Sequence, residues 1–379
     1  MENPLLKLEF FGQSIWMDFL RRSAIVSGEL KQLIDQDGVS GVTSNPSIFE
    51  KAIAESDDYN DAVHMLAGQG KSVTEIYKAL TVEDIQHTAD LFRPVYDRLD
   101  GRDGFVSLEV SPTLAADTAG TIEEARQLWK AVDRPNLMVK VPATPAGLPA
   151  IQQLIGEGIN INITLLFGLP RYRQVANAYL AGLETLALKG KPLERSASVA
   201  SFFLSRIDTL IDPMLDDLIQ GGGPRAKLAE GIHGELAIAS AKVAYQIYLE
   251  IFAQERFQKL AQKGARTQRL LWASTSTKNP EYSDVKYVEL IIGKDTINTL
   301  PLETIQLYRQ HGDPAPRLED NADEAYQKLD QLEQAGLNID ILTQQLEDEG
   351  VEKFDKAFEA LRKSLEENKE AALKKTVER

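Results

Sequence analysis

Cysteine is absent from the 379-residue sequence, which excludes disulfide bonds and thiolate metal sites. Histidine is scarce, and no two of the four residues have the spacing of a metal-binding pair: His64, His87, His233 and His311. Lysine and arginine (42) are outnumbered by aspartate and glutamate (57), so the net charge is −15. A charge of this sign argues against general binding of nucleic acid, but it leaves room for a small anionic substrate held by a few local cations.

Long uncharged apolar runs are also missing. The N-terminal residues 1–12 carry charged side chains, and no later stretch has the length and composition of a membrane span. The hydrophobic content of 43% is ordinary for a globular protein, and a chain of this length can bury a large core without disulfides. We therefore expect a soluble, cytoplasmic protein with no membrane partner.

Short apolar strands alternate with helix-like segments along most of the chain. This pattern is typical of a parallel sheet with crossover helices. Eight strands favour a closed barrel over an open sheet, so the sequence predicts an α/β fold, a (β/α)8 TIM barrel with additional helices. The expected strands are Ile15–Phe19, Gly41–Asn45, Phe105–Ser111, Leu137–Pro142, Ile159–Leu166, Ala197–Phe203, Arg269–Thr275 and Thr296–Leu300.

Three segments exceed what a simple barrel needs. Residues 47–104 are expected to hold two or three helices, and residues 206–266 a helix, a glycine-rich break and a long second helix. After the last strand, helices are expected over 321–335, 338–349 and 351–377, separated near Gly336 and Gly350. We interpret all of these as elaborations of a single domain that spans residues 1–379.

The expected fourth strand carries a lysine between apolar residues. Met138, Val139 and Val141 predict apolar cover around Lys140. Burial disfavours a charged amine, and a protein can make a lysine nucleophilic in this way. A Schiff base between Lys140 and a carbonyl substrate is one interpretation. The alternatives are a lysine that snorkels at a strand end and a lysine paired with a core carboxylate.

Other strands place polar side chains on the same face as Lys140. The fifth strand alternates strictly between isoleucine or leucine and asparagine or threonine, and the apolar set must face the surrounding helices. The polar set then points into the barrel, near the end where such barrels hold their active sites. The inward polar residues are Asp18, Asn45, Glu109, Lys140, Asn162, Thr164 and Ser201. This constellation favours catalysis, and the alternative is a buried polar network without chemistry.

Four motifs in order along the chain carry a resemblance to a known family. They are Gly41-Val-Thr-Ser-Asn-Pro-Ser-Ile-Phe49, Leu137-Met-Val-Lys-Val-Pro-Ala-Thr144, Gly158-Ile-Asn-Ile-Asn-Ile-Thr-Leu-Leu-Phe167 and Ser201-Phe-Phe-Leu-Ser-Arg206. Together, these motifs make the chain similar to transaldolases, in their longer bacterial-type subfamily. The resemblance covers the chain from about Phe10 to Pro301.

The resemblance implies a transferase of the pentose phosphate pathway that moves a dihydroxyacetone unit between sugar phosphates through a Schiff base. It implies no cofactor and no metal. The alternatives are a Schiff-base aldolase that releases the three-carbon unit and a non-catalytic sugar-phosphate-binding protein. The oligomeric state is left open between monomer and homodimer.

The resemblance also implies a role for each site residue. Lys140 is similar to the Schiff-base lysine, Asp18 to the acid/base aspartate, and Glu109 with Thr164 to the pair that holds a catalytic water. The expected substrate-binding residues are Asn45, Asn162, Ser201, Phe203, Arg206, Ser274 and Lys278. After the seventh strand the chain departs from the family pattern, because Trp272-Ala-Ser-Thr-Ser-Thr-Lys-Asn-Pro280 retains the serine but has no arginine. Lys278 is the nearest cation there, and a solvated loop lysine is the equally weighted alternative.

Overall fold

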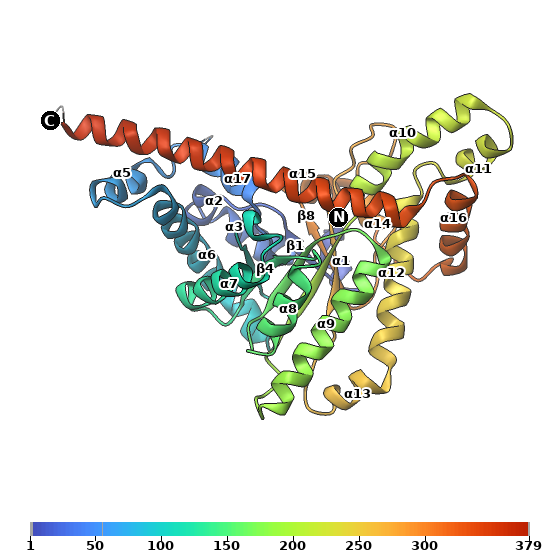
Figure 1. The fold of residues 1–379 in the computed structure, drawn as a ribbon, viewed down its shortest axis with the longest axis horizontal. Helices are drawn as coiled ribbons and strands as arrows, with labels where there is room; N and C mark the ends of the chain where they lie inside the picture. The colour runs from blue at the N-terminus through green and yellow to red at the C-terminus, as the bar shows by residue number, and fades with distance from the viewer. Residues whose placement is uncertain (1–2, 55, 378–379) are drawn as a thin grey trace.

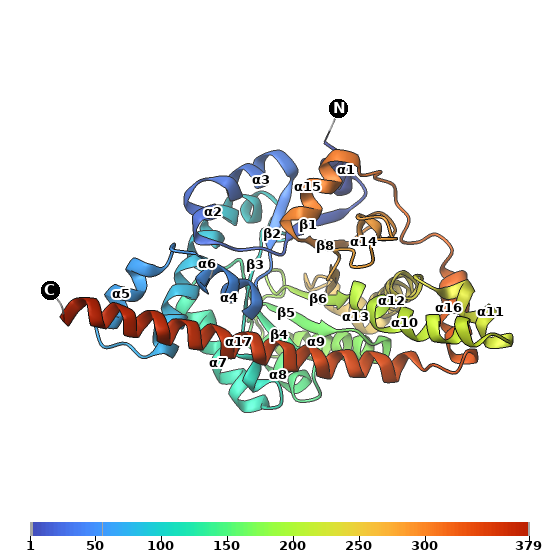
Figure 2. The same cartoon turned by 90° about the horizontal axis from the view of Figure 1, so that it is seen from above.

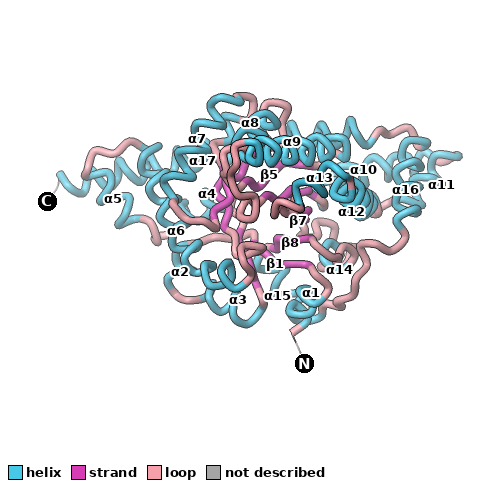
Figure 3. Tube along the Cα trace, turned by 90° about the horizontal axis from the view of Figure 1, so that it is seen from below, coloured by secondary structure: helices cyan, strands magenta, loops and turns pink. Residues whose placement is uncertain are grey.

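Eight parallel strands close into a barrel in the order of the sequence, and β1 pairs with β8. The structure is a computed structural model, and it describes residues 3–54 and 56–377. Figure 3 shows the strands in the middle of the molecule with helices around them. The predicted (β/α)8 barrel is confirmed. The strands are β1 (Gln13–Met17), β2 (Val39–Val42), β3 (Val106–Glu109), β4 (Leu137–Pro142), β5 (Ile161–Leu166), β6 (Ser198–Phe203), β7 (Arg269–Ala273) and β8 (Thr296–Leu300).

The expected and observed strand ends differ most at β2, which ends at Val42, three residues before Asn45. Asn45 lies instead just before helix α4 (Pro46–Ala54), where its Oδ1 accepts a hydrogen bond of 3.0 Å from the backbone N–H of Ile48. Asparagine favours this helix-start position because its side chain satisfies a free backbone donor. The candidate ligand Asn45 is therefore fixed by a helix start rather than by a strand.

Helices cover the outside of the barrel (Figure 1). Helix α1 (Pro4–Phe10) precedes β1, and α2 (Arg22–Val26) and α3 (Glu29–Asp37) lie between β1 and β2. Between β2 and β3 lie α4, α5 (Asn60–Gly68) and α6 (Val73–Arg98). The short helix η1 (Pro112–Leu114) and the crossover helices α7 (Thr118–Val132), α8 (Gly147–Ile155) and α9 (Leu169–Leu188) follow β3, β4 and β5. Between β6 and β7 lie α10 (Ser205–Gly221), α11 (Pro224–Ile232), α12 (Leu236–Ala253) and α13 (Glu255–Ala261), and later come α14 (Lys286–Glu289), α15 (Leu302–His311), α16 (Ala322–Gln334) and α17 (Ile339–Val377).

The segment between β6 and β7 differs from the expected single long helix after the glycine-rich break. It forms three helices, α11 to α13, and α12 is long and apolar enough to cross a membrane by length and composition alone. Of its most apolar window, 72% is buried inside the protein. The expectation that no stretch has membrane-span composition was wrong for α12, and its burial is that of a core helix.

Helix α17 is continuous from Ile339 to Val377, so the predicted break at Gly350 was wrong. Figures 1 and 2 show this helix as one long rod across the molecule, in contact with α4, α5, α6 and α10. A Cβ atom at position 350 would come 3.0 Å from Cδ2 of Leu165 at the end of β5. The glycine therefore allows the helix to approach the barrel closely, and this packing outweighs its helix cost of about 1 kcal/mol.

Two contacts far apart hold α17 in place. Arg171 of α9 forms an ion pair with Glu347, with 3.0 Å between Nε and Oε2, and both side chains are largely buried. The ring of Phe358 packs edge-on against Tyr77 of α6, with 5.3 Å between the ring centroids. These contacts anchor the C-terminal helix on opposite sides of the barrel end.

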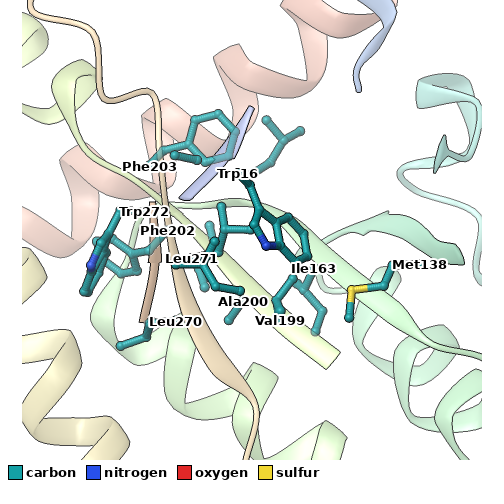
Figure 4. Packing of buried hydrophobic residues seen from close by; sticks show 14 of the residues in the cluster. Trp16, Met138, Ile163, Val199, Ala200, Phe202, Phe203, Leu270, Leu271 and Trp272 are labelled. Atoms are coloured by element: carbon teal, nitrogen blue, oxygen red, sulfur yellow. The ribbon is translucent and has the colours of Figure 1, made fainter. Parts of the chain in front are cut away.

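The barrel interior changes from apolar to polar along the strands. Trp16, Met138, Val199 and Ile297 line a cavity at the N-terminal end. Figure 4 shows Trp16, Met138 and Val199 on the inner side of the sheet, and Phe202 with Trp272 on the side that faces the helices. Two residues further along the same strands, the same face carries Asp18, Lys140, Ser201 and Thr299. Because side chains alternate with a period of two, each of these four strands supplies one apolar layer and one polar layer.

Candidate active site

A cavity of ≈ 380 Å³ opens at the C-terminal end of the barrel. Eight of the candidate residues from the sequence line it: Asp18, Asn45, Lys140, Ser201, Phe203, Arg206, Ser274 and Lys278. Glu109, Asn162 and Thr164 are buried in the strands beside it. The structure thus brings residues from seven separate strands or strand ends to one place, which is the location of active sites in barrel enzymes.

The strand register places three of these residues at one level. Glu109 of β3 pairs with Lys140 of β4, and Lys140 pairs with Asn162 of β5. Lys140 is only 3% exposed. Its Nζ lies 3.4 Å from Oε2 of Glu109 and donates a hydrogen bond of 3.1 Å to the backbone carbonyl of Ser44. These two contacts fix the amine in one orientation at the cavity wall.

Glu109 is buried beside Lys140. Burial raises its pKa to about 7, because the attraction of Lys140 offsets only part of the desolvation and Asp18 adds repulsion. Among the described residues, Oγ1 of Thr164 has no hydrogen-bond partner, and Oε2 of Glu109 has only its ion pair with Lys140. Buried polar atoms without partners are uncommon in native proteins, so both groups are available to a substrate or a water molecule.

Asp18 directly follows β1 and lines the same cavity as Lys140. Its Oδ1 accepts a hydrogen bond of 2.7 Å from Thr43, whose Oγ1 lies 2.8 Å from that of Thr299. Burial raises the pKa of Asp18, and Lys140, Thr43, Arg206 and Lys278 oppose that shift. A carboxyl group with a raised pKa is better suited than an ordinary aspartate to exchange protons near neutral pH.

Asn162 makes two hydrogen bonds within the barrel. Its Nδ2 donates to Oγ of Ser107 at 2.9 Å, and its Oδ1 accepts from Oγ of Ser201 at 2.6 Å. Ser201 lines the cavity, whereas Asn162 does not. The pair therefore forms one polar unit in which Asn162 orients Ser201, and contact of Asn162 itself with a ligand stays a prediction.

The part of the cavity after β6 and β7 is a cationic corner, which carries Arg206 and Lys278. Arg206 lies in the first turn of α10, with its guanidinium carbon 5.3 Å from the centroid of the Phe203 ring. Burial lowers the pKa of Arg206, while Asp18 and Glu349 act in the opposite direction. Oγ of Ser274 lies 3.0 Å from that of Ser205 at the start of the same helix. An arginine at a helix N-terminus is a suitable site for an anion.

Lys278 lies in the loop after β7 and is exposed at the rim, where its Nζ donates a hydrogen bond of 2.6 Å to Ser276. It lines the same cavity as Arg206. Lys278 is thus a solvent-exposed loop lysine, as the alternative expected, and it also lines the cavity. Its role in binding stays a prediction.

Sequence reasoning missed several residues of the cavity wall. Thr43 and Thr299 support Asp18. Thr43 has the same parity as Asn45 in the second expected strand, and in the eighth strand the alternation of Ile297 and Thr299 with their neighbours gave no comparable polar motif. The missed lining residues are Thr43, Ser47, Glu50, Lys51, Ala273, Ser276, Thr299, Pro301, Lys353 and Phe354. Lys353 and Phe354 belong to α17, and no local pattern indicates that this distant helix reaches the barrel end.

A closed parallel barrel with a buried lysine, two carboxyl groups and a cationic corner at its C-terminal end has the architecture of a barrel enzyme. A family model described as transaldolase/fructose-6-phosphate aldolase matches residues 15–365. The chain belongs to this family, and the resemblance found in its motifs is confirmed.

Curated relatives agree with this assignment. The chain is 49% identical over 370 residues to a transaldolase of Trichodesmium erythraeum, covering 96% of this chain and 97% of the relative. It is 48% identical over 350 residues to a transaldolase of Thiobacillus denitrificans, covering 92% and 96%. A transaldolase of Saccharopolyspora erythraea is 47% identical over 362 residues, with 95% and 96% covered. The similarity therefore extends through the C-terminal helices.

Proposed function

We propose that this protein is a transaldolase that moves a dihydroxyacetone unit from a ketose phosphate to an aldose phosphate through a Schiff base on Lys140. The observation that carries the proposal is the buried amine of Lys140, held 3.4 Å from a carboxyl group with a raised pKa on the wall of a cavity with a cationic corner. The family and its named relatives support the same activity. The donor would be sedoheptulose 7-phosphate or fructose 6-phosphate, and the acceptor glyceraldehyde 3-phosphate or erythrose 4-phosphate.

The first stage forms the imine. The free amine of Lys140 adds to the ketone carbon of the donor and gives a carbinolamine. Glu109 delivers a proton to the departing hydroxyl group through a water held with Thr164, and loss of water leaves a protonated imine. Among the described residues, Oγ1 of Thr164 makes no hydrogen bond, and Oε2 of Glu109 contacts only the amine of Lys140, which leaves both oxygen atoms room for a water molecule.

The second stage breaks and remakes a carbon–carbon bond. Asp18 accepts the proton of the C4 hydroxyl group, the C3–C4 electron pair moves into the imine, and an aldose leaves. The resulting enamine on Lys140 attacks the aldehyde carbon of the acceptor, and Asp18 returns its proton to the new hydroxyl group. Hydrolysis of the imine releases the new ketose, so the sequence balances without a redox step. Asn45 and Asn162 would orient the hydroxyl groups of the bound fragment.

The raised pKa of Glu109 predicts a pH effect on imine formation. Its protonated form is the proton donor, so the rate of imine formation should fall as pH rises through about 7. Rapid-quench borohydride trapping with fructose 6-phosphate and no acceptor measures this rate. The variant Glu109→Gln should be slower by roughly 10²-fold and should lose the inflection near pH 7. An unchanged inflection in this variant would exclude Glu109 as the proton donor.

Dependence on the acceptor separates transfer from simple cleavage. With fructose 6-phosphate alone, we expect each active site to release no more than about one molecule of glyceraldehyde 3-phosphate and almost no dihydroxyacetone, because the three-carbon unit stays on Lys140. Adding erythrose 4-phosphate should restore steady turnover. Rapid release of dihydroxyacetone without an acceptor would favour the aldolase alternative, and no reaction in either assay would favour the binding-protein alternative.

The remaining expectations are part of the same proposal. The net charge of −15 and the small cationic corner support a small anionic substrate in the cytoplasm rather than nucleic acid or a membrane. The contacts of α17 with α4, α6 and α10 support a single domain, in which the added segments 47–104, 206–266 and 321–377 pack against one another around the C-terminal end of the barrel. A monomer or a homodimer is expected, and sedimentation at several protein concentrations distinguishes them.

A further inference from the structure

We propose that Lys353, on the C-terminal helix α17, is a specificity-determining residue that binds the substrate phosphate together with Arg206. This inference rests on the proposed function and adds a ligand from a helix outside the barrel. The site would take the phosphate group of the sugar substrates, a compact dianion.

Helix packing places Lys353 at the cavity. Gly350, one turn before Lys353, lies so close to the barrel end that a Cβ atom there would be 3.6 Å from Nη1 of Arg206 and 3.0 Å from Leu165. Lys353 and Phe354 then line the same cavity as Arg206 and Lys278. Because glycine has no side chain, α17 can approach the barrel at position 350, and its next turn then lies at the cationic corner.

The positive charges at this rim lack partners. Lys51, Arg206, Lys278 and Lys353 all line the cavity, and none of them forms an ion pair with a carboxylate among the residues that the structure describes. The neighbouring Lys356, one turn further along α17, does pair with Glu352. Like charges gathered without counter-charge repel one another, and a bound anion removes that cost.

The electrostatic environment of Lys353 agrees with this grouping. The pKa of Lys353 is lowered, first by the charge of Arg206, then by burial, and further by Lys278 and Lys51. The carboxylates nearest this corner are Asp18 and Glu349, which both act on Arg206, and Glu50, which lines the cavity. Asp18 is assigned to proton transfer, so a ligand phosphate is the group that best neutralises the cations.

Arg206 and Lys353 suit a phosphate in complementary ways. The planar guanidinium of Arg206, backed by the ring of Phe203, offers several fixed donors. Lys353 supplies a compact charge from α17 at the rim of the same cavity. The lysine would thus replace the arginine that the loop after β7 does not supply.

The test uses the full chain with Lys353→Gln, Lys353→Arg and the matched control Lys356→Gln on the exposed face of the same helix. With sedoheptulose 7-phosphate as donor, KM is measured for two acceptors, glyceraldehyde 3-phosphate and unphosphorylated glyceraldehyde, by following the erythrose 4-phosphate released. We expect Lys353→Gln to raise KM for the phosphorylated acceptor about tenfold, the lower end for loss of a charged hydrogen bond. The KM for glyceraldehyde should change less than about twofold, because this acceptor has no phosphate. The value of kcat should also change less than about twofold, because the phosphate contact stabilises the bound substrate and the transition state equally.

Two further readouts separate binding from a structural role. Inorganic phosphate should inhibit Lys353→Gln more weakly than the native protein, and Lys353→Arg should restore both inhibition and KM. Equal values for Lys353→Gln and Lys356→Gln, or equal losses with both acceptors, would overturn the inference. Borohydride trapping on Lys140 accompanies each assay. A trapped adduct together with an unchanged KM in Lys353→Gln rejects the phosphate-binding role of Lys353 but not the proposed function. No adduct in the native protein rejects the proposed function.

Discussion

Replacing Lys140 with methionine is expected to abolish transfer, with a loss on the order of 10⁴-fold or more, the scale seen when a covalent nucleophile is removed. Methionine keeps the length and apolar stem of lysine but cannot form an imine. The 3.4 Å contact with Glu109 is lost, yet the raised pKa of Glu109 shows that this carboxyl group already accommodates the neutral form. The variant should therefore fold.

The measurement is a coupled assay for glyceraldehyde 3-phosphate released from fructose 6-phosphate and erythrose 4-phosphate. The control is Lys356→Met, which removes an exposed amine on α17. Circular dichroism and thermal unfolding establish that both variants are folded. Activity of Lys140→Met within about tenfold of the native protein would mean that another group carries the reaction.

Replacing Asp18 with asparagine is expected to stop carbon–carbon cleavage but not imine formation. Asparagine retains an oxygen that accepts the hydrogen bond of Thr43, so the local geometry should persist. It cannot accept the proton of the C4 hydroxyl group, and loss of a general base costs typically 10²- to 10⁴-fold. The complete six-carbon donor should accumulate on Lys140.

Mass spectrometry after borohydride reduction distinguishes the two adducts. The native protein should yield a three-carbon adduct from fructose 6-phosphate, and Asp18→Asn a six-carbon adduct. Asp348→Asn, an exposed change on α17, is the control and should behave like the native protein. A three-carbon adduct formed by Asp18→Asn at the native rate would remove Asp18 from the cleavage step.

The polar side of the barrel could be predicted because it follows from local alternation. Asn162 and Thr164 alternate with isoleucines that must face the helices, and the observed register pairs Asn162 with Lys140. The bounds of β4 and β8 were also correct, because a proline marks the end of each: β4 ends at Pro142, and Pro301 directly follows β8.

The features that the sequence did not reveal depend on distant packing. Gly350 has a local preference to end a helix, but its contact with Leu165, far away in the chain, keeps α17 continuous. The presence of Lys353 at the cavity depends on that close approach and on the other contacts that hold α17 on the barrel. Asn45 was expected at a strand end, and the competing preference of asparagine for a helix start decided its place.

The most direct test of the central claim is to locate the covalent intermediate. The native protein is mixed with fructose 6-phosphate, reduced with borohydride, digested and sequenced by mass spectrometry. The account predicts a single three-carbon adduct on Lys140, which diminishes when erythrose 4-phosphate is added before reduction. No adduct, or an adduct on a rim residue such as Lys278 or Lys353, would contradict it.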